Sequence, residues 1–233
     1  MFVTGTPLRV AVIATCALLA AAGCTSSDDD DASSGTVSVT TMRGAFLQAS
    51  EIGPTWAEPE DDASAAPVTS LVSFCGGAST APQIPPGADV ISSSLADEGT
   101  TGAQTLEQVA LVYADADSAA SGQSLLSAVA DGCQATQNVP ETVTDEKSEP
   151  AYTETTEVQD LSEGSWSGFV VLRHKSYEKE HPGTADTAVA VLTSRNVVLV
   201  DTYAIYRLDN ASASASFDSD WQRLVGSVIQ RVG

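Results

Sequence analysis

The segment "TAVAVLTSRNVVLVDTYAIYR", residues 187–207, decides the fold of this chain. It holds two runs rich in β-branched and aromatic residues, which favour strands, and Asn196 marks a turn between them. Two further β-prone segments precede it, "YTETTEVQDL" at 152–161 and "SWSGFVVLRHKSY" at 165–177, with glycine or proline in the connections. This pattern predicts an antiparallel β-meander from residue 151 onward.

A helical pattern follows at the end of the chain. Apolar residues recur there at spacings of three and four, which is typical of a helix that packs one stripe against a sheet. These residues are Trp221, Leu224, Val225, Val228, Ile229 and Val232. Ser219 and Gln222 are spaced for a capping box at the start of this helix.

Other elements are expected upstream of the meander. The stretch "SAASGQSLLSAVADGC" at 118–133 predicts a helix with Leu125, Val129 and Cys133 on its buried face. A short helix is expected at 42–52, with Phe46, Leu47 and Ile52 inward. The segments 68–75 and 105–113 are expected to be strands, and 134–150 an exposed loop. Together these elements predict an α+β fold, a single domain in which an antiparallel β-sheet packs with helices.

The N-terminus has the build of a secretory signal. Arg9 precedes an apolar run at 10–22, whose 13 residues are fewer than the about 20 that a membrane-spanning helix needs. The small residues at 21–23, directly before Cys24, resemble the lipobox of bacterial lipoproteins. That resemblance implies a signal peptide at 1–23 and a diacylglyceryl anchor with fatty acids such as palmitate on Cys24. The alternative is an ordinary signal peptide, with Cys24 incidental.

Residues 24–41 are expected to form a flexible acidic linker between the anchor and the domain. The sequence "TSSDDDDASSGTVSVTT" at 25–41 lacks large apolar side chains and cannot bury enough surface to fold. Its aspartates lack the spaced ligands of a calcium loop, so we interpret them as a solvated spacer and not as a metal site. The folded domain is therefore expected at 42–233.

Cysteine usage predicts one disulfide. Of the four cysteines, Cys16 lies in the predicted signal and Cys24 at the predicted lipidation site, which leaves Cys75 and Cys133 for the exported domain. An oxidising compartment favours their pairing. Two cysteines so far apart form neither a zinc knuckle nor a CxxC redox motif. A structural Cys75–Cys133 bond is the resulting prediction.

The charge balance excludes nucleic acid as a partner. The chain has 10 basic and 31 acidic residues, a formal net charge of −21, and no basic residue lies between Arg43 and Lys147. Contacts with phosphates need Lys and Arg. The acidity favours solubility of an exported protein over a specific cation-binding role.

No motif in the sequence indicates catalysis, a cofactor or a metal site. The two histidines, His174 and His181, belong to no HExxH or paired-histidine motif, and there is no GxSxG. The stretch "YADADS" at 113–118 lacks the glycine and distal glutamate of an EF-hand loop, so Asp115 or Asp117 is expected to cap a helix.

One cluster combines basic, acidic and imidazole groups, "RHKSYEKEH" at 173–181. Arg173, His174 and Lys175 are its candidate ligand-binding residues, because together they would suit an anionic ligand or partner. The alternative is a solvated hairpin end before Pro182.

Three segments carry a resemblance to a known family: "AFLQASEIGPTW" at 45–56, "EQVALVYADADSAASGQSLLSAVADGC" at 107–133 and "RNVVLVDTYAIY" at 195–206. They resemble the PknH-like extracellular sensor domains, which occur on mycobacterial receptor kinases and as free-standing actinobacterial lipoproteins. The resemblance covers most of 42–232. It implies a sheet whose helices form a cleft that binds an extracellular ligand, without catalysis.

Two classes of function follow. The first is a lipoprotein on the extracytoplasmic face of the cell membrane, whose sensor domain binds an unidentified envelope ligand or protein. The second is an envelope hydrolase with a carboxylate site that no motif marks. Two carboxylates about 5 to 9 Å apart in a deep cleft would favour the hydrolase. An apolar groove with few convergent polar groups would favour binding.

Overall fold

The computed structural model describes residues 35–59, 68–77, 79–99, 102–143, 148–177, 183–208 and 215–233. The predicted signal peptide at 1–23, the lipidation site Cys24 and the aspartate run of the linker lie outside these residues, as does His181. No helix in the described ranges is long and apolar enough to cross a membrane.

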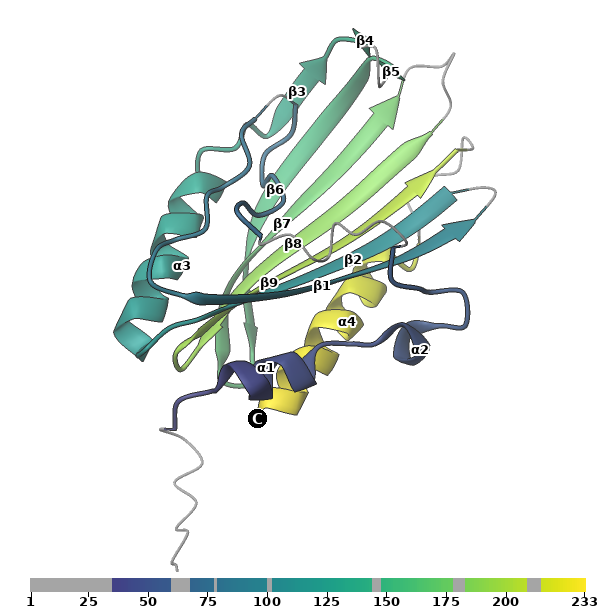
Figure 1. The fold of residues 1–233 in the computed structure, drawn as a ribbon. Coiled ribbons are helices and arrows are strands. Elements are labelled where there is room, and N and C mark those ends of the chain that lie inside the picture. Colours follow the sequence, from purple (N-terminus) through teal and green to yellow (C-terminus); the bar gives the residue numbers. More distant parts are fainter. Residues whose placement is uncertain are drawn as a thin grey trace, which may run out of the picture. The chain divides into compact units, whose positions relative to one another are not determined.

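The centre of the domain is an antiparallel sheet (Figure 1). Over the described ranges it has seven strands, in the order β1-β2-β9-β8-β7-β6-β3. Their bounds are β1 Asp89–Gly99, β2 Gly102–Val112, β3 Thr136–Val139, β6 Tyr152–Glu163, β7 Trp166–Tyr177, β8 Thr184–Ser194 and β9 Val197–Arg207. A separate two-stranded ribbon contains β4 (Thr142–Val143) and β5 (Ser148–Glu149). The predicted meander is confirmed as β6 to β9, and the predicted α+β fold is confirmed with it.

Helices cover both faces of the sheet. On one face α1 (Val39–Ala45) and α4 (Phe217–Val232) pack on alternate residues of the strands, and on the other face α3 (Ala116–Ala130) packs on the intervening ones. We call these the α4 face and the α3 face. All six residues of the predicted stripe on α4 are buried. That helix starts at Phe217 after Ser216, so the predicted capping box of Ser219 and Gln222 is wrong.

The helix predicted at 118–133 is present, but its predicted buried face is wrong. Leu125 is 56% exposed, whereas Leu126 is buried. The helix faces the sheet with Leu126 and with small residues, because these let it approach closely: a Cβ on Gly122 would collide with the Tyr113 hydroxyl. Cys133 follows the end of the helix. Asp115 does cap α3, accepting a hydrogen bond from the Ser118 N–H at 2.7 Å.

The first described residues belong to the folded domain, ahead of the boundary expected at Met42. The Val37 N–H donates to Asn196 Oδ1 (2.6 Å), and Asn196 Nδ2 donates to the Val37 carbonyl (3.1 Å). The helix expected at 42–52 is two short helices, α1 and α2 (Ala49–Ile52), because the backbone is extended at Phe46 and Gln48. Phe46 and Leu47 between them are buried, as predicted.

Three other expectations need correction. Residues 68–75 do not form a strand; they make one isolated bridge, between Ser70 and Gln83. Strand β1 was not expected, because its serine-rich sequence has few apolar residues. The loop expected at 134–150 contains β3, which pairs with β6 at the edge of the sheet.

Candidate ligand-binding cavity

A cavity of about 230 Å³ lies on the α3 face, under the segment 68–72. Its floor is formed by three adjacent strands, β1, β2 and β9. We call it the roofed cavity and the covering segment 68–72 the roof. The floor residues are Ser92, Ser93, Ser94, Glu107, Val109, Val200 and Thr202, the roof contributes Val68, Ser70, Leu71 and Val72, and Pro59 completes the lining.

The strand register explains how these floor residues meet. Glu107 on β2 is directly opposite Ser94 on β1 and Thr202 on β9. Residues directly opposite each other in an antiparallel sheet share a face and have neighbouring side chains. In the next row toward α3, Val109 is opposite Ser92 on β1 and Val200 on β9, so the part of this row on β2 and β9 is apolar. The floor therefore combines one carboxyl group and hydroxyl groups with an apolar surface.

Glu107 is the one charged side chain among the described residues that line the cavity. The residue is exposed at the edge of the cavity, and the protein atoms around its carboxyl group raise the pKa of that group by partial burial. No described residue donates a hydrogen bond or forms an ion pair with it. A carboxylate that is partly desolvated and has no donor is available to a ligand.

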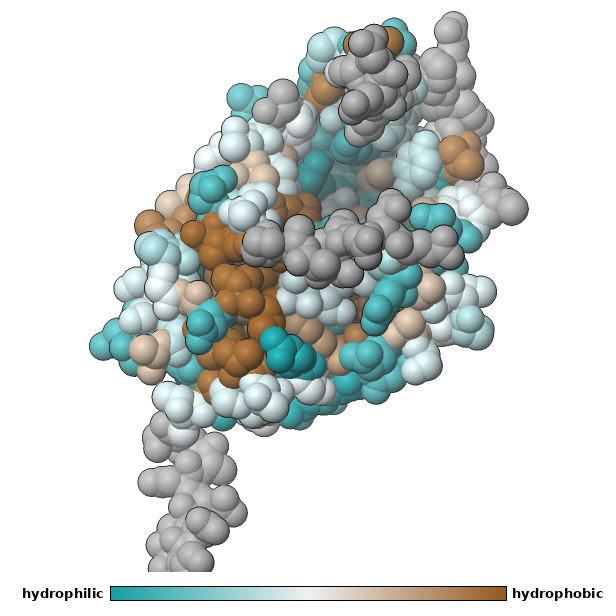
Figure 2. Space-filling view, in the orientation of Figure 1, coloured by the Kyte–Doolittle hydropathy of each residue, from teal (hydrophilic) through white to brown (hydrophobic). Residues whose placement is uncertain are grey.

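The roof continues into a segment that the core and a disulfide hold in place. Leu71 and Phe74 are buried in the same apolar cluster as Leu126 of α3. The predicted disulfide is confirmed: Cys75 is bonded to Cys133, with 5.0 Å between the Cα atoms. Figure 2 shows apolar surface, in brown, immediately to the right of α3.

A buried ion pair holds the same segment from the side of the meander. Arg173 Nε donates to Glu154 Oε1 at 2.6 Å, and its Nη1 donates to the Ser73 carbonyl at 2.9 Å. The other oxygen of Glu154 accepts from the Gly77 N–H at 3.2 Å. A Cβ at Gly76 would collide with this carboxylate, so glycine is required there. Arg173 therefore links the segment that follows the roof to the sheet.

The three candidate residues at 173–175 do not converge on one patch. Because successive residues of a strand point to opposite faces, Arg173 and Lys175 lie on the α3 face and His174 on the α4 face. Lys175 donates to Glu149 (3.0 Å) and lies 4.2 Å from the centroid of the Tyr152 ring. Burial lowers the pKa of Lys175, but its hydrogen bonds and the Glu149 charge outweigh this and raise it overall.

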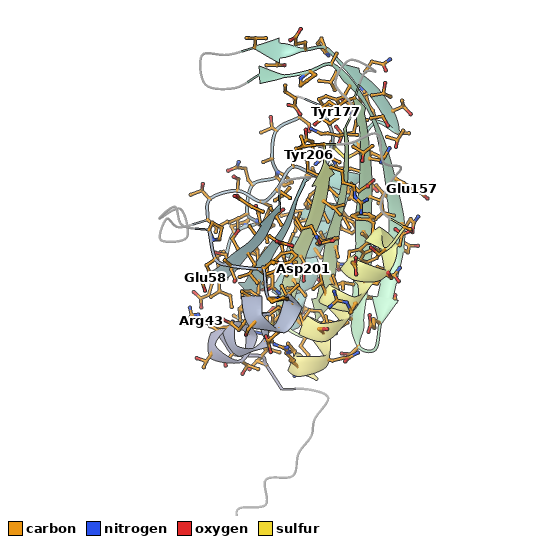
Figure 3. All side chains as sticks on the ribbon, turned by 90° about the vertical axis from the view of Figure 1, so that its right-hand side faces the viewer. Arg43, Glu58, Glu157, Tyr177, Asp201 and Tyr206 are labelled. Atoms are coloured by element: carbon orange, nitrogen blue, oxygen red, sulfur yellow. A yellow bond between two sulfur atoms is a disulfide. The ribbon has the colours of Figure 1, made fainter. Side chains whose placement is uncertain are left out.

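Tyrosines lie beside Lys175 on the α3 face, away from the roofed cavity. Tyr177 makes ring contacts with Tyr152 and Tyr206, at centroid distances of 5.5 and 6.2 Å. Figure 3 shows Tyr177 and Tyr206 toward one end of the strands, with Asp201 nearer the end where α1 and α4 pack. Burial and the Glu149 charge raise the pKa of Tyr177 far above its usual range.

His174 forms a hydrogen-bonded chain on the α4 face. Its Nδ1 lies 2.6 Å from Asp186 Oδ1, and its Nε2 lies 3.0 Å from Ser176 Oγ. This is the Ser-His-Asp order of acyl hydrolases. Ser176 lies inside β7, however, and pairs with β6 and β8, so its flanking amides belong to the strand ladder and not to an oxyanion site. These hydrogen bonds could not be predicted from the sequence, because Asp186 comes from the next strand and is not part of the local cluster at 173–181.

The described ranges also contain no group of three or more metal-ligating side chains. Nor does the roofed cavity show the facing carboxylates that would favour a glycosidase, because Glu107 is the one described acid that lines it. The roofed cavity instead corresponds to the apolar groove with few convergent polar groups, the arrangement that favours binding over hydrolysis.

Comparison with solved structures identifies a similar fold. The crystal structure of the extracellular domain of PknH from Mycobacterium tuberculosis matches with a TM-score of 0.51 and 17% sequence identity. The match covers 85% of this chain and 97% of that domain. No family model matches the chain, and a search of curated proteins found no relative. The resemblance predicted from the sequence is therefore confirmed at the level of the fold.

Proposed function

We propose that this chain is an extracytoplasmic binding or sensing domain that takes a small molecule in the roofed cavity, without catalysis. The observation that carries the proposal is the cavity itself, an apolar space with a few polar groups placed on its floor. Small-molecule sites are typically concave, apolar and furnished with few polar groups that fix the orientation of the ligand. The likeness of the fold to the extracellular domain of PknH supports a role in recognition.

The cavity offers a ligand two kinds of contact, apolar and hydrogen-bonding. Leu71, Val109 and Val200 provide an apolar wall, and removal of the ligand's own apolar surface from water against this wall supplies most of the binding free energy. Ser94, Thr202 and Glu107 offer hydrogen-bonding groups that would set the orientation. Because the disulfide and the Arg173 ion pair hold the segment after the roof, the ligand has less conformational entropy to remove on binding.

A cavity-filling substitution tests this proposal. In Ser92→Trp the indole would occupy the floor of the cavity. We expect native mass spectrometry of the chain purified from its own envelope to show a bound small molecule in the wild type and in the control Ser162→Trp, whose site on β6 is exposed and outside the cavity. The molecule should be absent from Ser92→Trp. A molecule retained by Ser92→Trp would contradict the proposal, as would a wild-type chain without one.

We further propose that the domain is attached to the outer side of the cell membrane through Cys24. The apolar run at 10–22, the lipobox-like residues before Cys24 and the acidic linker support this attachment, and the Cys75–Cys133 bond is consistent with an oxidising compartment. Cys24→Ala should move the protein from the membrane fraction to the soluble envelope fraction or the medium. A variant that still sediments with membranes would contradict lipidation.

The hydrolase alternative now rests on the Ser176-His174-Asp186 chain instead of on paired carboxylates. Because no oxyanion site accompanies Ser176 among the described residues, we expect the protein to be unreactive toward a fluorophosphonate probe, which labels activated serines. Labelling of Ser176 that is lost in His174→Ala would replace the binding proposal with catalysis on the α4 face.

A further inference from the structure

The chemistry of the cavity floor indicates a class of ligand. Glu107 is a carboxylate whose described neighbours across the strands, Ser94 and Thr202, carry hydroxyl groups and no positive charge. Two other acids of the sheet have partners: Glu154 is paired with Arg173, and Asp186 with His174. Glu107 differs from these two because it lines a cavity and has neither an ion pair nor a hydrogen bond from a described residue.

A carboxylate in this state favours a ligand that brings positive charge and N–H donors together. Desolvation of an unpaired charge is costly, and a charge-assisted hydrogen bond offsets that cost more than a neutral one does. A ligand carboxylate or phosphate would add repulsion and would meet no basic side chain among the described lining residues. The formal charge of −21 acts in the same direction, because it raises the local concentration of cations and lowers that of anions.

The volume and the apolar lining of the cavity limit the size and the polarity of the rest of the ligand. A cavity of about 150 Å³ is known to hold benzene, so about 230 Å³ accommodates a ring with a short arm. The valines at 109 and 200 form an apolar row beside the Glu107 row, so the body of the ligand would lie on one row while its polar end reaches the other.

We infer that the roofed cavity takes a small amphiphilic cation, an apolar body about the size of a benzene ring that carries a primary ammonium group. The ammonium group would donate to the Glu107 carboxylate and to the hydroxyl groups of Ser94 and Thr202, while the body packs between the valines and Leu71. This inference rests on the proposed function, since it specifies the chemistry of the ligand in the same cavity.

A set of probes with one body and three charges tests the inference: phenethylamine, 2-phenylethanol and 3-phenylpropanoate. Binding of each to the full exported chain would be measured by NMR titration at neutral pH. We expect phenethylamine to bind about tenfold more tightly than 2-phenylethanol, and 3-phenylpropanoate to bind most weakly. Glu107→Gln should weaken phenethylamine binding about tenfold and leave 2-phenylethanol unchanged. The control Glu98→Gln, on the exposed end of β1, should change neither.

The outcomes separate this inference from the proposed function. If the amine and the alcohol bind equally, or if Glu107→Gln leaves the amine unaffected while Ser92→Trp abolishes binding of both, the cavity binds ligands and the cation preference is wrong. If no probe binds the wild type, or if Ser92→Trp leaves binding of every probe unchanged, the proposed function fails and the inference fails with it.

Discussion

The pairing of β2 with β9 places two acidic residues on opposite faces of the sheet. Glu107 is opposite Thr202 on the α3 face, and the next pair along the ladder, Gln108 and Asp201, lies on the α4 face. Burial raises the pKa of both carboxyl groups, and that of Asp201 reaches about 7. The two acids are thus perturbed in the same direction by the same cause.

Their surroundings nevertheless differ. Asp201 is 1% exposed inside the core that α1 and α4 form, and neither of its oxygens has a hydrogen-bond partner of good geometry, although the Gln108 amide opposite partly offsets the effect of burial. The side-chain oxygen Oε1 of Gln108 accepts a hydrogen bond from the Leu47 N–H at 3.0 Å, which fixes the chain after α1. Glu107 faces a cavity that a ligand can reach. The same physical effect therefore bears on stability at Asp201 and on recognition at Glu107.

The largest expected effect comes from removing the disulfide on the α3 face. The bond between Cys75 and Cys133 closes a loop with a sequence separation of 58, for which the chain-entropy model gives about 4 kcal/mol of stabilisation. We expect the double variant Cys75→Ser/Cys133→Ser to lower the free energy of unfolding by about that amount in urea titrations. Reduction of the wild type should reproduce the loss. A loss below about 1 kcal/mol in both experiments would show that the disulfide contributes little to the free energy of unfolding.

The second prediction concerns Asp201, the acid that is buried in the core of the α4 face. Asp201 has a folded-state pKa of about 7 against an ordinary 3.8, so the folded state holds the proton more tightly, and stability falls as pH rises from about 4 to about 7. Each pKa unit corresponds to about 1.4 kcal/mol. Structural relaxation around the charge reduces the total, so we expect ionisation to cost about 2 kcal/mol at pH 8.

Asp201→Asn removes that ionisation. The variant should therefore be more stable than the wild type by about 2 kcal/mol at pH 8 and nearly equal to it at pH 4, as measured by urea unfolding at both pH values. The exposed Asp160→Asn is the matched control and should not show this difference. Equal destabilisation of Asp201→Asn at both pH values would mean that the carboxylate is well solvated or hydrogen-bonded in the folded state.

Periodicity explains which parts of the fold could be predicted from the sequence. The stripe on α4 repeats over about three turns and the meander strands carry long β-branched runs, so tertiary packing and local pattern agree. Strand β1 has only Ile91 and Leu95 as large residues on its buried side and resembles a polar loop. Segment 68–75 has the composition of a strand, but it lies over the sheet and not in it. The disulfide followed from counting cysteines.

The cavity could not be predicted, because its floor is assembled by register. Ser94, Glu107 and Thr202 come from three strands, and nothing in the local sequence of any of them indicates that they are neighbours. The alternation around Glu107 predicts which residues share its face, but not that α3 leaves this part of the face uncovered. The cluster at 173–175 was conspicuous because its charges are consecutive, and consecutive strand residues are divided between the two faces.

The smallest expected effect concerns which side of α3 packs against the sheet. Adjacent residues of this helix have opposite environments: Leu125 is 56% exposed and Leu126 is 1% exposed. Truncating an exposed leucine removes little buried surface, so Leu125→Ala should change the free energy of unfolding by less than about 0.5 kcal/mol. Leu126→Ala, the matched control, creates a cavity against the sheet and should cost about 3 kcal/mol. Chemical denaturation of both variants measures the difference, and a larger loss for Leu125→Ala would mean that α3 turns the other side of its surface toward the sheet.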